Sequence, residues 1–280
     1  MNRSRRMMTG CAVPTRVRIT RFYTAFRATY DRSFYFDGES HDFWELVYVV
    51  DGAVGVTAGN EVHTLRQGQL LLHPPLEFHR IWAAENTDPT VIILSFQAEA
   101  LQIGSGEVYT LPAERGQQLE QILSSLRQSH VAGTYMLMRL RADGGEEAAR
   151  AACALESVLL SLPESGRPDT LDRSVTAQHY RTIIAVMETH LSEPLTIDRL
   201  AQLCRMSESA LKKTFRRYTG LGVMHYFAQM KIRRAMDYLR SGERICDVSE
   251  RLGFENQNYF STVFRRITGK SPSEFRKMAE

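Results

Sequence analysis

The segment LTIDRLAQLCRMSESALKKTFRRYTG, residues 195–220, has a counterpart in SGERICDVSERLGFENQNYFSTVFRRITG, residues 241–269. In each segment a short stretch with apolar residues at helical spacing is followed by a turn and a second helical stretch. Both segments end in Phe-Arg-Arg-x-Thr-Gly, and the two copies of this ending lie 49 residues apart. A short helix, a turn and a second helix form the helix-turn-helix motif. The sequence therefore predicts two such units, at residues 196–220 and 244–269.

The second helix of each unit carries side chains that suit contacts with DNA. In this motif the second helix enters the major groove, where hydrogen-bonding side chains meet base edges and cations meet phosphates. The predicted base contacts are Ser209, Lys212 and Lys213 in the first unit and Gln257, Asn258, Ser261 and Thr262 in the second. The predicted phosphate contacts, one turn later, are Arg216, Arg217, Arg265 and Arg266. The alternative to DNA contact is that both polar helix faces are merely solvated parts of a helix bundle. The occurrence of the same pattern in two corresponding segments argues against this alternative.

The charge of the chain is unevenly divided between its two halves. Residues 1–175 hold 17 Arg, no Lys and 21 acidic residues, whereas residues 176–280 hold 18 Lys and Arg against 11 acidic residues. The net charge of +3 thus conceals a basic C-terminal half, as expected of a part that binds nucleic acid. Between the halves, residues 163–174 contain two Pro, one Gly and little to bury. We therefore place a linker at residues 166–175.

The composition excludes several classes of protein. With 280 residues, 43% of them hydrophobic and 24% charged, the chain is typical of a globular protein with about two domains. No stretch approaches the roughly 18 apolar residues of a membrane span, so we expect no membrane contact. Residues 1–18 contain five Arg but no apolar core, which indicates a flexible basic arm and not a secretory signal. Four scattered cysteines favour a reducing cytoplasm over a disulfide framework.

The N-terminal half changes its pattern near residue 110. Short apolar runs separated by turn residues, such as 43–50 and 91–96, predict strands and a β-sandwich or small barrel at residues 19–110. Helical spacing follows over residues 111–165. The whole chain is thus expected to be an α+β multidomain protein, with a β-barrel first and an all-α domain at residues 176–280.

One helical stripe in residues 145–162 has two interpretations. Its apolar side chains include Leu155, Val158, Leu159 and Leu162. A stripe of this kind packs either on the barrel of its own chain or on a second copy of the protein. We predict a dimerisation segment here, with packing inside one chain as the alternative.

Residues 176–280 resemble the DNA-binding domain of the AraC/XylS family of bacterial transcription regulators. The resemblance rests on the stretch from Leu195 to Phe215, on Arg233-Arg234-Ala235, and on Leu252-Gly253-Phe254-Glu255 with Asn258-Tyr259-Phe260. It rests also on T-G-x-S-P-S-E-F-R at residues 268–276. Thr262 and Lys213 stand where the family commonly carries Arg, which implies a shorter contact from Thr262. The resemblance implies a regulator that binds double-stranded DNA as a homodimer, with RNA polymerase as a further partner of an activator.

The N-terminal half resembles the cupin barrel, the usual sensor domain of this family. The cupin metal spacing reads here as Glu39-x-His41-x3-Glu45-x6-Gly52, then Gly68-x5-Pro74-x-Leu76-x2-His79. Strand parity would point Glu39, His41 and Glu45 to the barrel interior together. We therefore predict an effector site at Glu39, His41, Glu45 and His79, and assign no role to His63 and His73.

Three occupants of this effector site stay open. A divalent metal held by His41, Glu45 and His79 is one. A metal-free pocket for a small molecule such as a sugar is the second, and side chains that only satisfy one another are the third. No cofactor is required by the predicted function, which is that of an effector-controlled, cytoplasmic, non-enzymatic regulator. The rival hypotheses are a metal-dependent cupin enzyme tethered to DNA and a DNA-binding protein without an effector.

Overall fold

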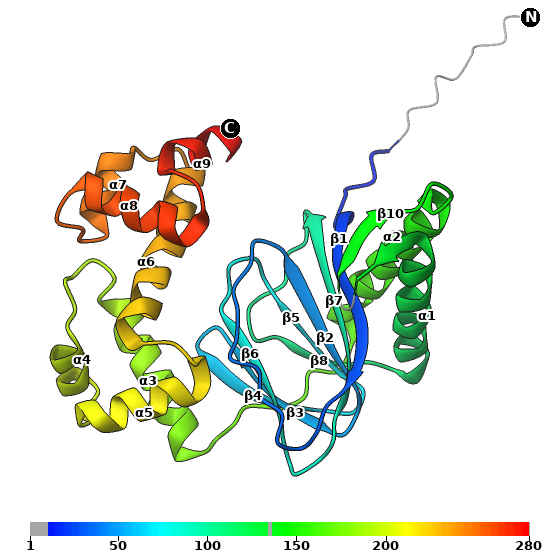
Figure 1. Ribbon diagram of the computed structural model, residues 1–280, viewed down its shortest axis with the longest axis horizontal. Helices are drawn as coiled ribbons and strands as arrows, with labels where there is room; N and C mark the ends of the chain where they lie inside the picture. Colours follow the sequence, from blue (N-terminus) through cyan, green and yellow to red (C-terminus); the bar gives the residue numbers. More distant parts are fainter. Residues whose placement is uncertain (1–10, 134–135, 280) are drawn as a thin grey trace, which may run out of the picture.

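The computed structural model describes residues 11–133 and 136–279. Figure 1 shows two parts, a sheet-rich N-terminal domain with two long helices and an all-helical C-terminal domain. Most of the predicted basic arm, including Arg3, Arg5 and Arg6, lies outside the described residues. The arrangement confirms the expected α+β multidomain class.

Strands form two antiparallel sheets in the N-terminal domain. They are β1 (Arg18–Thr29), β2 (Trp44–Asp51), β3 (Ala53–Ala58), β4 (Glu61–Arg66), β5 (Gln69–His73), β6 (His79–Ala83), β7 (Thr90–Glu99) and β8 (Val108–Thr110). One sheet has the order β1-β7-β2-β5-β8 and the other the order β4-β3-β6. The sheets enclose a core that includes Val47, Val54, Leu71, Ile81 and Ile93. The expected barrel is therefore filled with aliphatic side chains.

The outer face of the larger sheet is covered by helices. These are α1 (Ala113–Ser129) and α2 (Gly145–Ser161), which the short hairpin β9 (His130–Ala132) and β10 (Leu137–Leu140) connects, and α2 continues into the 3-10 helix η1 (Leu162–Glu164). Alternation along β2 explains the two layers. Trp44, Leu46 and Tyr48 face the helices, whereas Val47 and Val49 face the barrel interior.

The stripe predicted to mediate dimerisation lies inside this core. Leu155, Val158, Leu159 and Leu162 are 0%, 0%, 3% and 0% exposed, and they pack with α1 and the larger sheet. The prediction that these four side chains contact a second copy is therefore wrong, and the alternative of packing within one chain holds. Helical periodicity shows that a face is buried but not what covers it.

Helices make up the C-terminal domain. They are α3 (Val175–Thr189), α4 (Ile197–Leu203), α5 (Glu208–Thr219), α6 (Val223–Arg240), α7 (Ile245–Arg251), α8 (Gln257–Thr268) and α9 (Pro272–Ala279). Two apolar cores form around them, one from α3 to α6, which also includes Val62 and Phe78 of the barrel domain, and the other from α6 to α9. The long helix α6 therefore joins two subdomains, each with one helix-turn-helix unit (Figure 1).

The segment between the domains is held on the barrel. The Thr110 amide donates to the Gly166 carbonyl (2.7 Å), and the Thr64 amide donates to the Thr170 carbonyl (2.8 Å). The Thr170 side chain is 5% exposed, and its hydroxyl lies 2.9 Å from Nδ1 of His63. This segment was expected to bury little, but strand-like pairing along β4 fixes it.

Candidate DNA-binding and effector sites

The first recognition helix, α5, is bounded by local capping contacts. The Ser207 hydroxyl accepts a hydrogen bond from the Ala210 amide at 3.2 Å, and Gly220 ends the helix with φ 66°. Leu211 and Phe215 are fully buried and hold the helix on its domain. The predicted base contacts on the opposite face, Ser209, Lys212 and Lys213, are all exposed, as is Arg216. They follow the i, i+3, i+4, i+7 spacing of one helix face.

The second recognition helix, α8, repeats this design. The Asn256 side chain accepts from the Tyr259 amide at 2.8 Å, and Gly269 ends the helix with φ 74°. Phe260 and Phe264 are fully buried. The predicted contact residues Gln257, Asn258, Thr262, Arg265 and Arg266 are exposed, and Ser261 is half-buried. Each unit therefore presents a polar and cationic helix face to solvent, as a major-groove reader requires.

Arg217 differs from the other predicted phosphate contacts. It is exposed, but it lines a cavity of about 290 Å³ together with Arg80 and Trp82 of the barrel. Its guanidinium lies 5.7 Å from the ring centre of Tyr218. Arg217 thus lies at the barrel-facing margin of α5.

The predicted effector residues come together at one end of the barrel. Glu39, His41, Glu45 and His79 each offer a ligand atom, and these atoms lie within 4.8 Å of one another. Nε2 of His41 lies 3.5 Å from Oε2 of Glu45, and Nε2 of His79 lies 3.3 Å from Oε1. Both nitrogens are buried and lack a hydrogen-bond partner of suitable geometry. We call these four residues the barrel-end cluster.

The path by which these residues meet differs from the expected one. Of the three residues expected to point inward by strand parity, Glu45 lies on β2, whereas Glu39 and His41 lie before β2 begins at Trp44. Glu39 reaches the cluster through an antiparallel bridge with His79, and the two backbones exchange hydrogen bonds of 3.0 Å. Leu76, which replaces the cupin Gly, adopts φ 67°, a conformation that glycine adopts without strain.

In the barrel-end cluster, the adjacent histidines stabilise the negative charge of Glu45. Burial favours a raised pKa for the Glu45 carboxyl, but contact with His41 and His79 outweighs burial and lowers the pKa well below its usual range. Burial likewise favours a lower pKa for His79, but the contact with Glu45 outweighs it and raises the pKa. The carboxylate therefore stays ionised in the interior, where it is able to bind a cation.

Three neighbours of the cluster were missed in the sequence. The ring of His73 stacks on His79 with ring centres 4.3 Å apart, and its Nδ1 lies 2.9 Å from Oε1 of Glu77. Burial lowers the pKa of His73. The Ser95 hydroxyl donates to Oε2 of Glu45 at 2.9 Å. His73 lies opposite Glu45 because of the register in which β5 pairs with β2. Residue spacing along the chain does not reveal this register.

Strand β6 connects the barrel-end cluster with the first recognition helix. His79 and Ile81 point into the barrel, whereas Phe78 packs at 5.7 Å ring-centre distance against Tyr226 of α6. Arg80, also on the outer face, donates to the carbonyls of Arg216 (3.1 Å) and Arg217 (2.7 Å) at the end of α5. No sequence pattern predicted this contact, because it joins residues that lie 136 and 137 positions apart.

Comparison with known families assigns the class of protein that these two domains define. Residues 23–202 match the family described as AraC-like ligand binding domain, and residues 200–278 match a helix-turn-helix domain. The chain therefore belongs to the AraC family, which confirms the resemblance seen in the sequence.

The relatives of known sequence are transcription activators. An HTH-type transcriptional activator RhaR of Klebsiella pneumoniae is 38% identical over 96 residues, which cover 34% of this chain and 34% of RhaR. RhaR of Salmonella schwarzengrund is 34% identical over 119 residues, covering 42% of this chain and 39% of RhaR. The chain thus matches little more than a third of the length of these relatives. They lend no support to a cupin enzyme.

Among solved structures, ToxT from Vibrio cholerae O395 is 12% identical, with a TM-score of 0.39, over 92% of this chain and 97% of ToxT. In the described part of the chain, no helix combines the length and apolar character that crossing a membrane requires.

Proposed function

We propose that the protein is a cytoplasmic transcriptional regulator that binds double-stranded DNA through α5 and α8 and is controlled by its N-terminal domain. The observation that carries this proposal is the pair of recognition helices with matching caps and exposed polar faces. Family membership supports it. The predicted homodimer and a contact with RNA polymerase are parts of the same proposal.

The DNA-binding proposal is tested by mobility shift with full-length protein at increasing salt. Affinity should fall steeply with salt because cationic side chains release counterions from phosphates. Lys213→Ala should relax base preference at one position, with a cost of about 1–3 kcal/mol for a direct contact, and Arg216→Ala should weaken all sequences alike. Arg150→Ala, on the exposed side of α2, is the matched control. Identical behaviour of the Lys213 and Arg216 variants would overturn the division into base and phosphate contacts.

The barrel-end cluster fits a divalent metal better than a sugar. Around an ion with bonds of about 2.1 Å, tetrahedral ligands lie about 3.4 Å apart, and the Nε2-to-carboxylate distances in the cluster are 3.3 and 3.5 Å. Such an ion would satisfy the two orphaned nitrogens. The buried core inside the barrel is made of aliphatic side chains, which offer no hydrogen bonds to the hydroxyl groups of a sugar. Glu39, His41, Glu45 and His79 would hold it, and it would tie the 39–41 segment and β2 to β6.

Metal analysis of untagged protein tests this assignment. We expect near-stoichiometric zinc or another divalent transition metal, which His41→Ala and Glu45→Gln should abolish. His190→Ala is the control, because this histidine caps the C-terminal end of α3, where its Nδ1 contacts Thr189 and Val186, and it is not part of the barrel-end cluster. Equal metal content in all variants would exclude the cluster as the site. Wild-type protein that stays metal-free after incubation with zinc would exclude a metal altogether.

The structure supports one route from the cluster to DNA. His79 belongs to the cluster, and the next residue, Arg80, holds the carbonyl end of α5. A change in the position of β6 would therefore move or release the first recognition helix. We propose that the N-terminal domain shifts the population of DNA-competent arrangements in this way.

The proposed homodimer needs an exposed surface in place of the buried stripe. Met138 and Leu140 of β10 are 67% and 48% exposed, and they border a groove of about 570 Å³ beside β1 and α2. We propose that a second copy covers this face, since it adjoins the predicted segment 145–162.

A further inference from the structure

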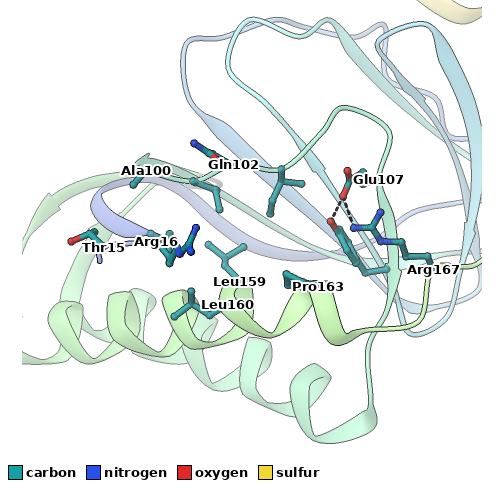
Figure 2. A pocket seen from close by; sticks show the side chains of 13 residues that line it. Thr15, Arg16, Ala100, Gln102, Glu107, Leu159, Leu160, Pro163 and Arg167 are labelled. Carbon is teal, nitrogen blue, oxygen red and sulfur yellow. Dashed lines mark hydrogen bonds and ion pairs between the residues drawn. The ribbon is translucent and has the colours of Figure 1, made fainter. Parts of the chain in front are cut away.

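A second cavity lies outside the two sheets, where the segment before β1, the loop after β7 and the end of α2 meet. Its volume is about 500 Å³, which is within the roughly 300–1,000 Å³ of small-molecule sites. Figure 2 shows side chains from all of these segments converging on it. None of the four residues of the barrel-end cluster lines this cavity, so it is a separate place on the domain.

Apolar side chains from three segments line the cavity. Its apolar lining residues are Val17, Leu101, Ile103, Leu159, Leu160 and Pro163. Leu160 is 53% exposed, although its neighbour Leu159 is buried in the core. In Figure 2, Leu159 and Pro163 lie between Arg16 and Arg167, and Leu160 lies below Arg16. A ligand here would therefore cover an exposed leucine with an apolar body.

The two ends of the cavity differ in charge. At one end Arg167 pairs with Glu107 at 3.2 Å, and the Tyr109 hydroxyl donates to the same carboxylate (Figure 2). At the other end lies Arg16, which forms no ion pair with any residue that the structure describes. The lining thus carries one cation in excess, because Glu107 compensates only Arg167. A negatively charged ligand group would balance Arg16.

We propose that this cavity binds an organic monocarboxylate with an elongated apolar body. Its carboxylate would meet the planar guanidinium of Arg16, which suits a two-pronged contact. Its body would lie on Leu160, and a polar group at its far end would meet Arg167 and Glu107. The inference rests on the proposed regulatory function and deepens it, since it names the chemical class of the organic effector.

The position of the cavity explains how binding of such a ligand would affect the DNA-binding domain. Arg167 belongs to the segment that pairs with the barrel, where the Asp172 amide donates to the Val62 carbonyl at 2.8 Å. Two residues later, the Ser174 hydroxyl accepts from the Ala177 amide at 3.2 Å and caps α3. The chain is therefore held by hydrogen bonds from the cavity wall to the first helix of the DNA-binding domain.

Calorimetric titration of the full-length protein tests the binding. The probes are 3-phenylpropionate and octanoate, with uncharged 3-phenylpropionamide as the matched control ligand. We expect the acids to bind and the amide to bind at least about tenfold more weakly, because it lacks the charge-assisted contact. Arg16→Gln should cause a similar loss for the acids, and Leu160→Trp should block them by filling the cavity. Arg127→Gln, at an exposed arginine of α1 that lines neither this cavity nor the groove beside β10, should bind normally.

The opposite results overturn the inference. They are equal affinities for acid and amide, unchanged binding in Arg16→Gln, or no binding of either acid by folded protein. Mobility shift then separates this inference from the proposed function. A severalfold change in DNA affinity on adding the acid, absent in Arg16→Gln, supports both. Specific DNA binding without any ligand binding overturns only the inference, whereas ligand binding by a protein that never binds DNA overturns the proposed function.

Discussion

Replacement of Arg80 by alanine should weaken the docking of the two domains. The Arg80 side chain donates to three carbonyls, those of Phe36 (2.9 Å), Arg216 (3.1 Å) and Arg217 (2.7 Å). The residue is 8% exposed, and its positive charge faces the carbonyl end of α5, where a cation is favoured. Hydrogen bonds to charged groups contribute roughly 1.5–3 kcal/mol each, part of which water recovers once the side chain is removed. We therefore expect a loss of roughly 2–4 kcal/mol in the free energy of domain docking.

Urea unfolding with two probes measures this loss. Trp44 packs in the core of the barrel domain, whereas Trp82 lies against Tyr218 of α5, with ring centres 6.1 Å apart. All variants are therefore compared in a Trp82→Phe background, where tryptophan fluorescence reports the barrel domain and circular dichroism reports mainly the helices of the C-terminal domain. The two transitions should separate in Arg80→Ala, and Arg80→Lys should lie between it and the wild type, because lysine keeps the charge but not the guanidinium fork. The matched control is Arg66→Ala, which removes an exposed ion pair with Glu85 that contributes at most about 1 kcal/mol. If the two alanine variants unfold alike, the hydrogen bonds from Arg80 to α5 do not stabilise the docking of the domains.

The remaining predictions concern helix ends, acid stability and assembly. Gly220→Ala should destabilise the protein more than Gly269→Ala. An added Cβ at position 220 would lie 2.5 Å from the Asp37 carbonyl oxygen, whereas one at position 269 would meet nothing within 4 Å. Thermal unfolding of both variants measures the difference in stability. In chelator-treated protein, folding lowers the pKa of the Glu45 carboxyl, so this group stabilises the fold at pH values above 4.5, the ordinary pKa of a glutamate. The free energy of unfolding should therefore fall as the pH drops below 4.5. Glu45→Gln should make this fall shallower in acid titrations. Met138→Glu with Leu140→Glu should convert the proposed dimer to a monomer in sedimentation, whereas wild-type protein that is monomeric at high concentration would refute the dimer.

The two recognition helices were predictable from the sequence because their signals are local. Ser207 and Asn256 cap helices whose amides lie three residues away, and Gly220 and Gly269 end them in the left-handed region. The capping box at Ser271 is equally local: its hydroxyl accepts from the Glu274 amide at 3.2 Å. Such contacts depend only on neighbours along the chain. Their repetition at an interval of 49 residues was therefore enough to predict the two DNA-reading faces.

Contacts between distant segments were decided only by the tertiary structure. The periodicity of Leu155 and its neighbours showed an apolar face, but α1 and the larger sheet cover it where a second copy was predicted. His73 joins the barrel-end cluster through strand register, and Arg80 reaches α5 through domain docking. Residue type and spacing do not encode these partners, because a buried histidine or arginine has the same sequence signature as an exposed one. The sequence by itself thus determined the class of domain and the polar faces of α5 and α8 that we propose read DNA, while packing determined which side chains surround the cluster and how the domains are joined.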